Sequence, residues 1–300
     1  MVLFLGVDGG SSKTSAVITD ESGRVLFKAR GGGSNYYALG AKKAEHNLYK
    51  LISSLLKKRE LKLAGACFGI AGIDSEREYN IVNSSIKQGL SKLIKCRFIL
   101  VNDVNLILPA INCENGVAAV GGTGSNFYAI NGRKEARASG MGHILADEGG
   151  AIYLGNRVLR AAVQSFDGRG KKTVLEKLAL KKAGVKNIRE LKGMISDVGH
   201  VESVADFAPL AEKAANMGDS IAKKILDKAA DEQAKGIRAV ARRVELSNPV
   251  IGFAGSTFKV KYLFDGIKRR VREFAPHAKF YIVKNSAVGA ARLAIKKFGK

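Results

Sequence analysis

The chain has 300 residues, 46% of them hydrophobic and 26% charged, so it is long enough for two domains and its composition argues against disorder. No apolar run approaches the roughly 18 residues that a membrane span needs, and the first residues form no basic leader, which predicts a cytoplasmic protein that does not bind membranes. Its three cysteines, Cys67, Cys96 and Cys113, and its four histidines show no metal-binding spacing, so no zinc or iron–sulfur site is expected.

The net charge of +23 has two interpretations. It could attract nucleic acid or another anionic partner, or it could reflect a lysine-rich surface of the kind that keeps a thermophile protein in solution. The lysines are spread along three amphipathic segments, residues 41–58, 171–192 and 223–243, and no nucleic-acid-binding signature accompanies them. The sequence therefore favours the second interpretation and disfavours nucleic acid as a partner.

The first part of the chain predicts a strand meander followed by alternating helices and strands. Helical spacing of apolar residues predicts helices, and short apolar runs bounded by turn residues predict strands. This order indicates an α/β domain. The expected strands cover residues 2–7, 15–19, 25–28, 64–70 and 97–101, the expected helices 41–58, 79–90 and 104–111, and a flexible loop residues 31–35.

The remainder of the chain repeats this order, with a block of helices inserted. The expected elements are a meander over 117–138, a helix over 151–164, a helical block over 173–244, strands over 249–254 and 279–283, and a helix over 286–298. We therefore expect a first domain over 1–110, a second over 111–285, and a C-terminal helix within 286–300 that packs back on the first domain. A cleft between the two domains would hold the ligand.

A glycine-rich turn follows the first strand. Glycines allow backbone N–H groups to approach an anion, and hydroxyl groups and a lysine add donors. The turn is not a Walker A loop, because Ser12 stands where that motif needs glycine. A plain hairpin turn is the alternative. Asp8 is placed to hold Mg²⁺ or its water shell, and the candidate phosphate-binding residues are Gly9, Gly10, Ser11, Ser12, Lys13 and Thr14.

A second turn of this type, Gly122-Thr123-Gly124, follows the first strand of the repeat. It contains no lysine, so backbone N–H groups would dominate phosphate binding. Each turn is a weak signal by itself. Two such turns, about one domain apart, predict a duplicated fold with a phosphate-binding loop in each half.

Two carboxylates follow these elements at positions where chemistry is expected. Asp103 comes directly after a buried strand, where it could act as a general base in phosphoryl transfer or as the N-cap of the next helix. Asp147 precedes a helix, where it could bind two substrate hydroxyls or act as a cap and dipole partner. Gly255-Ser256 ends another strand and could let an adenine lie against the backbone, although turn chemistry explains it nearly as well.

Taken in order, the strings 8–14, 102–103, 122–126 and 140–149 resemble the sugar kinases of the acetate kinase–hexokinase–actin superfamily. The resemblance is to the N-acetylglucosamine kinase group of the BadF/BadG/BcrA/BcrD ATPase family, which also includes archaeal hexokinases. It implies a duplicated actin-like ATPase (ribonuclease H-like) α/β fold with two domains around a nucleotide cleft. It also implies an ATP-dependent kinase that uses ATP and Mg²⁺ and phosphorylates a hexose or an N-acetylhexosamine.

The resemblance also implies roles for individual residues. Asp103 would be the catalytic base, and Asp8 would lie near Mg²⁺. Both glycine-rich turns would bind phosphate, and Gly255 and Ser256 would bind adenosine. The residues implied in sugar binding are Asn35, Asp103, Ser125, Asn126, Gly142 and Asp147.

Two alternatives belong to other functional classes. An ATPase that activates a partner protein, as in another branch of the family, would hold an iron–sulfur cluster, and the three cysteines do not supply that arrangement. A non-catalytic sugar or nucleotide sensor would not need Asp8 and Asp103. The sequence does not identify the sugar, and a homodimer is only the usual default for such proteins.

Overall fold

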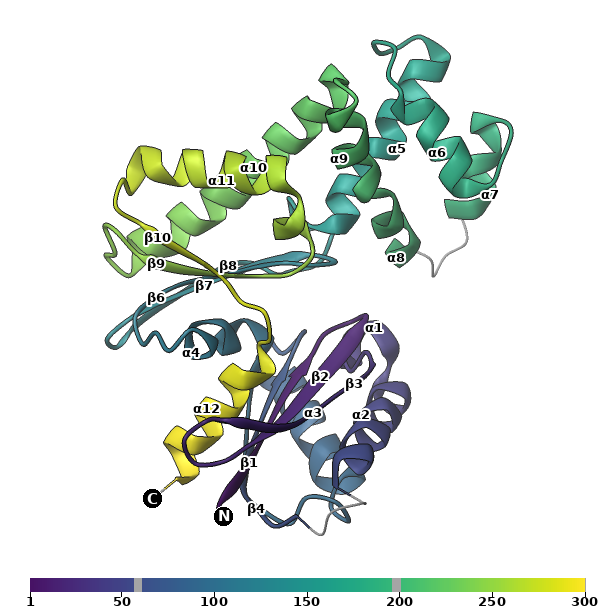
Figure 1. Cartoon of the computed structure of the whole chain (residues 1–300). Helices are drawn as coiled ribbons and strands as arrows, with labels where there is room; N and C mark the ends of the chain where they lie inside the picture. The colour runs from purple at the N-terminus through teal and green to yellow at the C-terminus, as the bar shows by residue number, and fades with distance from the viewer. Residues whose placement is uncertain (57–60, 196–200, 300) are drawn as a thin grey trace. The chain divides into compact units, whose positions relative to one another are not determined.

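The computed structural model describes residues 1–56, 61–195 and 201–299, so Lys57 and Lys58 of one predicted helix lie outside the described residues. The chain forms two compact units (Figure 1). The first unit contains Met1–Ala118, Val250–Gly252 and Tyr281–Lys300, and the second contains Ala119–Pro249 and Phe253–Phe280.

The two five-stranded sheets have the same strand order. The first is β3-β2-β1-β4-β5 and the second, read from its other edge, is β8-β7-β6-β9-β10, so each runs third-second-first-fourth-fifth in chain order. This repeated order confirms the predicted duplicated α/β fold. The strands are β1 (Leu3–Gly9), β2 (Lys13–Thr19), β3 (Val25–Gly32), β4 (Leu63–Ile70), β5 (Phe98–Asn102), β6 (Gly116–Gly121), β7 (Ser125–Asn131), β8 (Lys134–Ser139), β9 (Val250–Ala254) and β10 (Lys279–Ile282).

In the first sheet β2 is antiparallel to β1 and β3, whereas β1, β4 and β5 are parallel. The register aligns Asp8 with Gly69, and Ile70 with Asn102. The loops that follow the three parallel strands therefore start at the same edge of the sheet. In open α/β sheets this edge is where ligands bind.

The predicted flexible loop over residues 31–35 is wrong for its first two residues. Gly31 and Gly32 continue β3, where they pair with Thr14 and Lys13. Their glycine composition predicts a loop, but backbone pairing with β2 holds both residues in the extended conformation of a strand. Helix α3 also begins earlier than predicted, because Ser75 and Glu78 form a capping box at its start.

The helices of the first unit cover both faces of its sheet. A core beneath α2 and α3 contains Leu5, Val7, Phe68 and other buried apolar side chains. On the other face α12 packs on β1 and β4. These helices are α1 (Tyr36–Leu39), α2 (Ala41–Leu56), α3 (Glu76–Gly89), η1 (Asp103–Leu106), α4 (Ile107–Ala110) and α12 (Ala287–Phe298).

Helix α12 lies very close to β1, because its contact face is built from small residues. A Cβ atom at Gly6 would overlap the Ala287 carbonyl oxygen and the Ala291 backbone nitrogen. Backbone atoms cannot move aside as a flexible side chain can, so this position requires glycine.

We therefore expect Gly6→Ala to lower the free energy of unfolding by about 1–3 kcal/mol or more, since overpacking must displace α12. Urea unfolding measures the change. Gly193→Ala is the control, because a Cβ atom there meets nothing within 4 Å. A Gly6→Ala variant as stable as Gly193→Ala would contradict the tight packing of α12.

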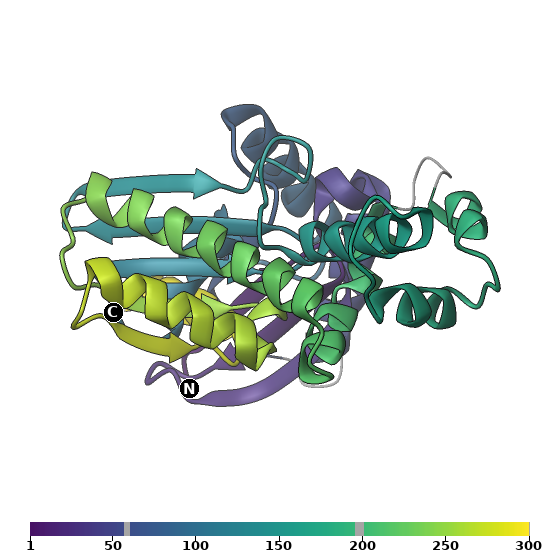
Figure 2. The same ribbon diagram turned by 90° about the horizontal axis from the view of Figure 1, so that it is seen from above.

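In the second unit α10 lies against β7 and β8, and α11 lies beside α10 (Figure 2). The predicted helical block is divided into shorter helices that precede the long α10. The helices of this unit are α5 (Ala151–Asp167), α6 (Leu175–Ala183), η2 (Ile188–Glu190), α7 (Leu191–Ile195), α8 (Val201–Val204), η3 (Ala205–Phe207), α9 (Pro209–Asn216), α10 (Ser220–Arg243), η4 (Thr257–Lys259) and α11 (Lys261–Phe274).

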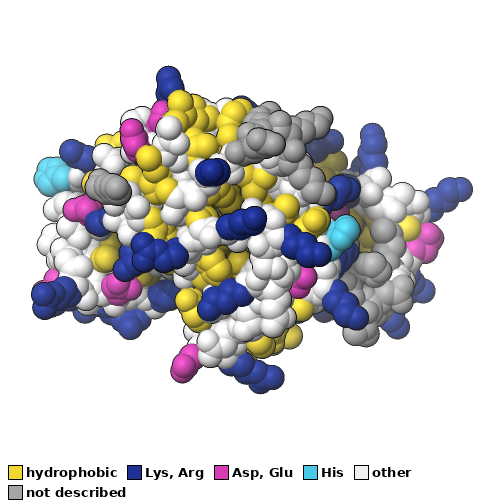
Figure 3. Space-filling view, turned by 90° about the horizontal axis from the view of Figure 1, so that it is seen from below, with side chains coloured by type: hydrophobic (Ala, Val, Ile, Leu, Met, Phe, Trp, Pro, Cys, Tyr) yellow, Lys and Arg dark blue, Asp and Glu magenta, His cyan; other side chains and the backbone are white. Residues whose placement is uncertain are grey.

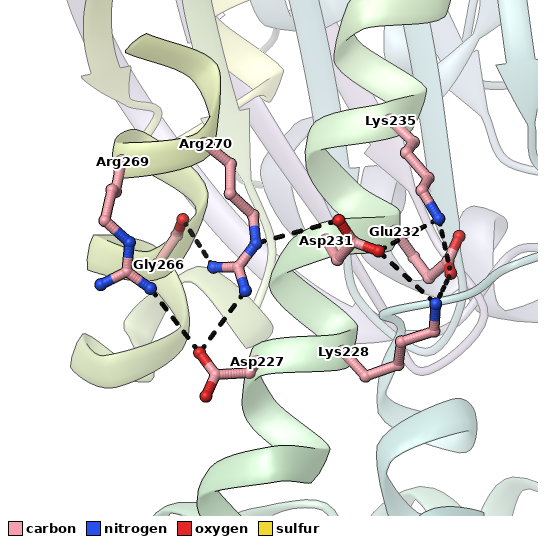
Figure 4. A network of polar contacts seen from close by, with 8 residues as sticks. All are labelled: Asp227, Lys228, Asp231, Glu232, Lys235, Gly266, Arg269 and Arg270. Atoms are coloured by element: carbon pink, nitrogen blue, oxygen red, sulfur yellow. Dashed lines mark hydrogen bonds and ion pairs between the residues drawn. The ribbon is translucent and has the colours of Figure 1, made fainter. Parts of the chain in front are cut away.

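A network of charged side chains joins α10 to α11 (Figure 4). Asp227 on α10 lies 3.7 Å from Arg269 and 3.5 Å from Arg270 on α11. Lys228 and Lys235 bind Asp231 and Glu232 along α10 itself. The exposed fractions of these side chains range from 20% for Arg270 to 68% for Arg269, so each ion pair contributes little to stability by itself.

On the face drawn in Figure 3, Lys and Arg side chains stand mostly singly among neutral and apolar groups, with no single dense basic patch. Within the described residues, no helix is both long and apolar enough to cross a membrane.

Candidate functional site

The first glycine-rich turn joins β1 to β2 and is held in place by hydrogen bonds to residues 33–35. The Gly10 amide donates to the Lys13 carbonyl at 3.0 Å, which closes the turn. The Gly10 carbonyl accepts from the amides of Ser34 and Asn35 at 2.9 and 3.2 Å. The shape of this loop is therefore set before any ligand binds.

Two glycines allow this close approach. A Cβ atom at Gly33 would overlap the Ser11 carbonyl oxygen, and one at Gly9 would overlap the Ser34 hydroxyl. The turn and the 33–35 segment are thus in backbone contact, and neither glycine tolerates a side chain without moving the loop.

The polar side chains of this turn have different surroundings. Ser12 and Lys13 are exposed, whereas Thr14 is completely buried. The Thr14 Oγ1 atom lies 2.8 Å from both the Gly32 carbonyl oxygen and the Ser34 Oγ atom. Ser12 and Lys13 can therefore reach a ligand, while the hydroxyl of Thr14 stabilises the loop.

Asn35 lies between this turn and the loop after β4. Its Nδ2 atom donates to Ser11 Oγ at 3.0 Å, and its Oδ1 atom caps α1 by accepting from the amides of Tyr37 and Ala38. A Cβ atom at Gly72, whose φ is +80°, would lie 2.9 Å from the same Oδ1 atom. The side chain of Asn35 is thus held in one orientation.

Asp8 lies near the end of β1, on the face of the sheet that α12 covers. The Ser286 hydroxyl donates to its carboxylate at the start of that helix. Burial raises the pKa of Asp8 to about 6, although the charge of Lys13 and the Ser286 hydrogen bond lower it. A cation bound at this carboxylate would favour its charged form.

This pKa predicts a pH-dependent stability. The folded pKa of Asp8 is about 6 and its ordinary value is 3.8, so the folded protein binds more protons and loses stability as pH rises through this window. In metal-free buffer we expect Asp8→Asn to raise the free energy of unfolding by about 1–3 kcal/mol at pH 8 and to leave it unchanged at pH 4.

Urea unfolding at both pH values measures this difference. The control is Glu21→Gln, an exposed carboxylate on the turn after β2, which should behave alike at both pH values. A gain in stability that is equal at pH 4 and pH 8 would show that Asp8 is not the group responsible.

Asp103 is the first residue of η1 and follows β5 at the same sheet edge as Asp8. The alternative that Asp103 caps the next helix is wrong, because Asn102 is the N-cap and its Oδ1 atom accepts from the Val104 amide at 3.2 Å. The Nδ2 atom of Asn102 also donates to the Ile73 carbonyl at 3.1 Å and to Asp74 at 3.0 Å. Asn102 therefore supports the backbone from which the partly buried Asp103 projects.

The second glycine-rich turn joins β6 to β7 and is held in place by hydrogen bonds from the first residues of α5. The Ala151 amide donates to the Gly122 carbonyl at 2.9 Å, and the Ile152 amide donates to the Thr123 carbonyl at 3.1 Å. A Cβ atom at Gly150 would lie 2.6–2.8 Å from backbone atoms of Gly124. Two of the first amides of α5 are therefore used to shape this loop.

Asp147 lies against this second turn. It has φ of +70°, a strained conformation for a residue with a side chain, and a Cβ atom at Gly124 would overlap its carboxylate. The Gly140 amide donates to Asp147 Oδ1 at 3.1 Å, and the Asp147 amide donates to Ser139 Oγ at 3.1 Å. The alternative that Asp147 caps α5 is wrong, because Gly150 is the N-cap and no side chain caps this helix.

Burial raises the pKa of Asp147, and the nearby charge of Glu148 raises it further. Hydrogen bonds from the backbone of Gly140 and Ser125, together with His143, act in the opposite direction. A strained, half-buried carboxylate that does not cap its helix is typical of a binding group.

The remaining predicted sugar-site residues lie around Asp147. Ser125 is almost completely buried, and its hydroxyl lies 2.9 Å from the Glu148 carbonyl oxygen and 3.1 Å from Ser139 Oγ. Asn126 pairs with Ser139, and its side chain lies beneath Gly140. Gly142 has φ of +84° and open space around it.

The predicted adenosine turn contacts the end of β6, where the second glycine-rich turn begins. Gly255 has φ of +123°, and a Cβ atom there would overlap the Gly121 carbonyl oxygen. The Thr257 hydroxyl donates to the same oxygen at 2.8 Å. Gly255 and Ser256 are themselves exposed, so they are accessible to a ligand.

Three supporting residues were not predicted from the sequence: Ser139, Thr257 and Gln233. Each is a polar residue that holds the backbone of a neighbouring loop, and the Gln233 Nε2 atom donates to the Gly149 carbonyl at 3.1 Å. Gln233 lies on α10 among the buried Ala229, Ala230 and Ile237, and a polar residue within such an apolar stripe is the signal that could have identified it.

The structure thus groups the predicted residues within each unit. The first unit brings together Asp8, the first turn, Asn35 and Asp103 along one sheet edge, where carboxylates could bind a cation and accept a proton. The second unit brings together the second turn, residues 125–126, Asp147 and Gly255, where amides and a carboxylate could bind phosphate and hydroxyl groups. Among the residues that the structure describes, no three His, Cys, Asp or Glu side chains form a metal-binding cluster.

Comparison with known proteins gives a consistent result. The model of the BadF/BadG/BcrA/BcrD ATPase family matches residues 5–294. The N-acetylmuramic acid/N-acetylglucosamine kinase of Clostridium acetobutylicum is 31% identical over 98% of both chains, and the N-acetyl-D-glucosamine kinase of Dictyostelium discoideum is 26% identical over 98% of both. A ROK family glucokinase from Streptomyces griseus, solved with glucose and AMPPNP, shares the fold with a TM-score of 0.62, 18% identity, and coverage of 98% of this chain and 99% of its own.

Proposed function

Because the chain belongs to the BadF/BadG/BcrA/BcrD ATPase family, we propose that it is an ATP-dependent sugar kinase whose acceptor is an N-acetylated amino sugar. The observation that carries this proposal is the Asp147 segment. Its carboxylate is held at positive φ against a glycine loop and caps no helix, which suits the binding of sugar hydroxyls. The names of the two kinase relatives support the substrate class.

In the proposed reaction Asp103 accepts the proton of the attacking sugar hydroxyl. The hydroxyl oxygen forms a bond to the γ-phosphorus while the bond from that phosphorus to the bridging oxygen of ADP breaks. Asp103 lies at the carboxyl edge of parallel strands and its helix is capped by another residue, which supports this role. Asp147, Asn35, Ser125, Asn126 and Gly142 would orient the sugar.

The two glycine-rich turns would hold the phosphates, and Gly255 and Ser256 would contact the adenosine. Ser12 and Lys13 are exposed donors on the first turn, which supports a phosphate-binding role. We propose that the reaction uses residues of both units.

A kinase that uses the ATP of the cell would act in the cytoplasm.

Mg²⁺ fits the residues of the first unit. When bound, it would neutralise charge on the phosphates, and Asp8 would hold it directly or through water. Mg²⁺ commonly takes one or two protein carboxylates and completes its shell with phosphate oxygens and water, so a single Asp8 suffices. The raised pKa of Asp8 supports this assignment, because a nearby cation would offset the unfavourable burial of its charge.

The proposal is tested by measuring ADP release with N-acetylglucosamine, N-acetylmuramic acid, glucosamine and glucose, with a reaction without sugar as the baseline. We expect release that depends on an N-acetylated sugar, together with a sugar phosphate identified by mass spectrometry. ATP hydrolysis that no sugar stimulates would favour an ATPase that activates a partner. Tight sugar binding without ADP release would favour a sensor.

A further inference from the structure

A cavity of about 770 Å³ lies in the helical part of the second unit. Its floor is apolar and comes from the second half of α5 and from the segment that begins at η2. Leu159, Ile188 and Leu191 are recessed there with exposed fractions of 8%, 5% and 3%, whereas Phe166 is 41% exposed. None of the predicted ATP-binding or sugar-binding residues lines this cavity.

The rim of the cavity is strongly basic. Arg160, Arg169, Arg189 and Lys192 surround the apolar floor, and Asp167 is the one acidic side chain among the described lining residues. Asp167 is already paired with Arg169, whose Nε and Nη2 atoms lie 2.9 and 2.7 Å from its Oδ2 atom. Across the described part of the chain, no carboxylate forms an ion pair with the other three.

We propose that this cavity binds a small amphiphilic anion, a compound with an aromatic or branched apolar body and one carboxylate, sulfate or phosphate group. The volume lies within the roughly 300–1,000 Å³ typical of small-molecule sites, and such sites combine apolar walls with a few charged groups. The apolar body contacts the recessed floor and Phe166. The anionic group is bound by Arg189 and Lys192, which form no ion pair with a carboxylate among the residues that the structure describes.

A small molecule fits better than a protein partner, because the most apolar part of the site is recessed. A flat protein surface would contact the charged rim and leave Ile188 and Leu191 uncovered. A single drug-sized compound reaches both.

The probe for the experiment is anilinonaphthalene sulfonate, an aromatic sulfonate whose fluorescence rises in an apolar site. We expect saturable binding to the full-length protein, at least about 10-fold tighter than binding of uncharged phenylnaphthylamine, since a hydrogen bond to a charged group contributes about 1.5–3 kcal/mol. We expect the double variant Arg189→Gln, Lys192→Gln to weaken binding of the sulfonate by about 10-fold or more and to leave the uncharged compound unaffected.

The matched control is the double variant Lys181→Gln, Lys182→Gln, which removes two exposed lysines of α6 outside the cavity. It should bind the probe as the original protein does. Phe166→Ala, which alters an exposed ring only, should weaken binding of both compounds.

Three results would overturn the proposal: equal binding of the charged and uncharged compounds, equal loss in both double variants, or displacement of the probe by ATP. Binding of an acidic peptide without binding of the probe would instead identify a protein partner. All these readouts are independent of kinase activity, so the proposed function and this site can fail separately.

Discussion

Asp103→Asn should lower the turnover of sugar phosphorylation by about 10²–10⁴-fold, the usual contribution of a general base, while ATP binds nearly as before. The amide cannot accept the hydroxyl proton. Because Asn102 caps η1, replacing Asp103 leaves the start of that helix intact. A loss of turnover would therefore reflect the missing proton acceptor and not a change in the helix. Steady-state ADP release gives kcat, and titration with a non-hydrolysable ATP analogue gives the dissociation constant.

The control for this experiment is Asp74→Asn, which alters an exposed carboxylate at the neighbouring strand end. Its side chain can still accept from Asn102, so we expect a much smaller change in kcat. Turnover that is unchanged in Asp103→Asn, or that falls equally in both variants, would rule out Asp103 as the base.

Asp147→Asn should raise the KM for the sugar by about 10–100-fold and leave the KM for ATP nearly unchanged. A hydrogen bond from a sugar hydroxyl to a charged group is worth about 1.5–3 kcal/mol, and the amide loses most of this. Asparagine tolerates positive φ well, so the backbone at this position should keep its shape. Initial rates over a range of sugar and ATP concentrations separate the two KM values.

Glu148→Gln is the matched control, because Glu148 is the adjacent carboxylate and its side chain is exposed. It should leave both KM values close to those of the original protein. A rise in the KM for ATP in Asp147→Asn, without a change in the KM for the sugar, would show that this carboxylate binds the nucleotide and not the sugar.

The sequence predicted the strands and the two glycine-rich turns because these depend on local patterns. Apolar runs bounded by turn residues marked the meanders, and the repeated order marked the duplication, which the matching sheet orders confirm. The family resemblance rested on short strings in a fixed order, and the match over residues 5–294 confirms it.

The supporting contacts could not be predicted, since they join residues far apart in the chain. Thr257 reaches the Gly121 carbonyl across 136 positions, and Gln233 reaches Gly149 across 84. The alternative that each carboxylate is a helix cap is wrong for a related reason in both cases. Asp103 and Asp147 occur at helix starts in the sequence, but the backbone places the cap one residue earlier in the first case and three residues later in the second.

The packing of α12 has a consequence for synthesis of the protein. The first unit contains residues that precede and residues that follow the second unit in the chain, and its β1 is covered by α12, which is translated after the second unit. The second unit, whose residues precede α12 in the chain, can form its helices and most of its sheet while this face of β1 is still uncovered. We therefore expect the first unit to become fully native after the second, against the usual order of domain folding during translation. A nascent chain arrested before Tyr281 would expose the apolar face of β1 and β4 to chaperones.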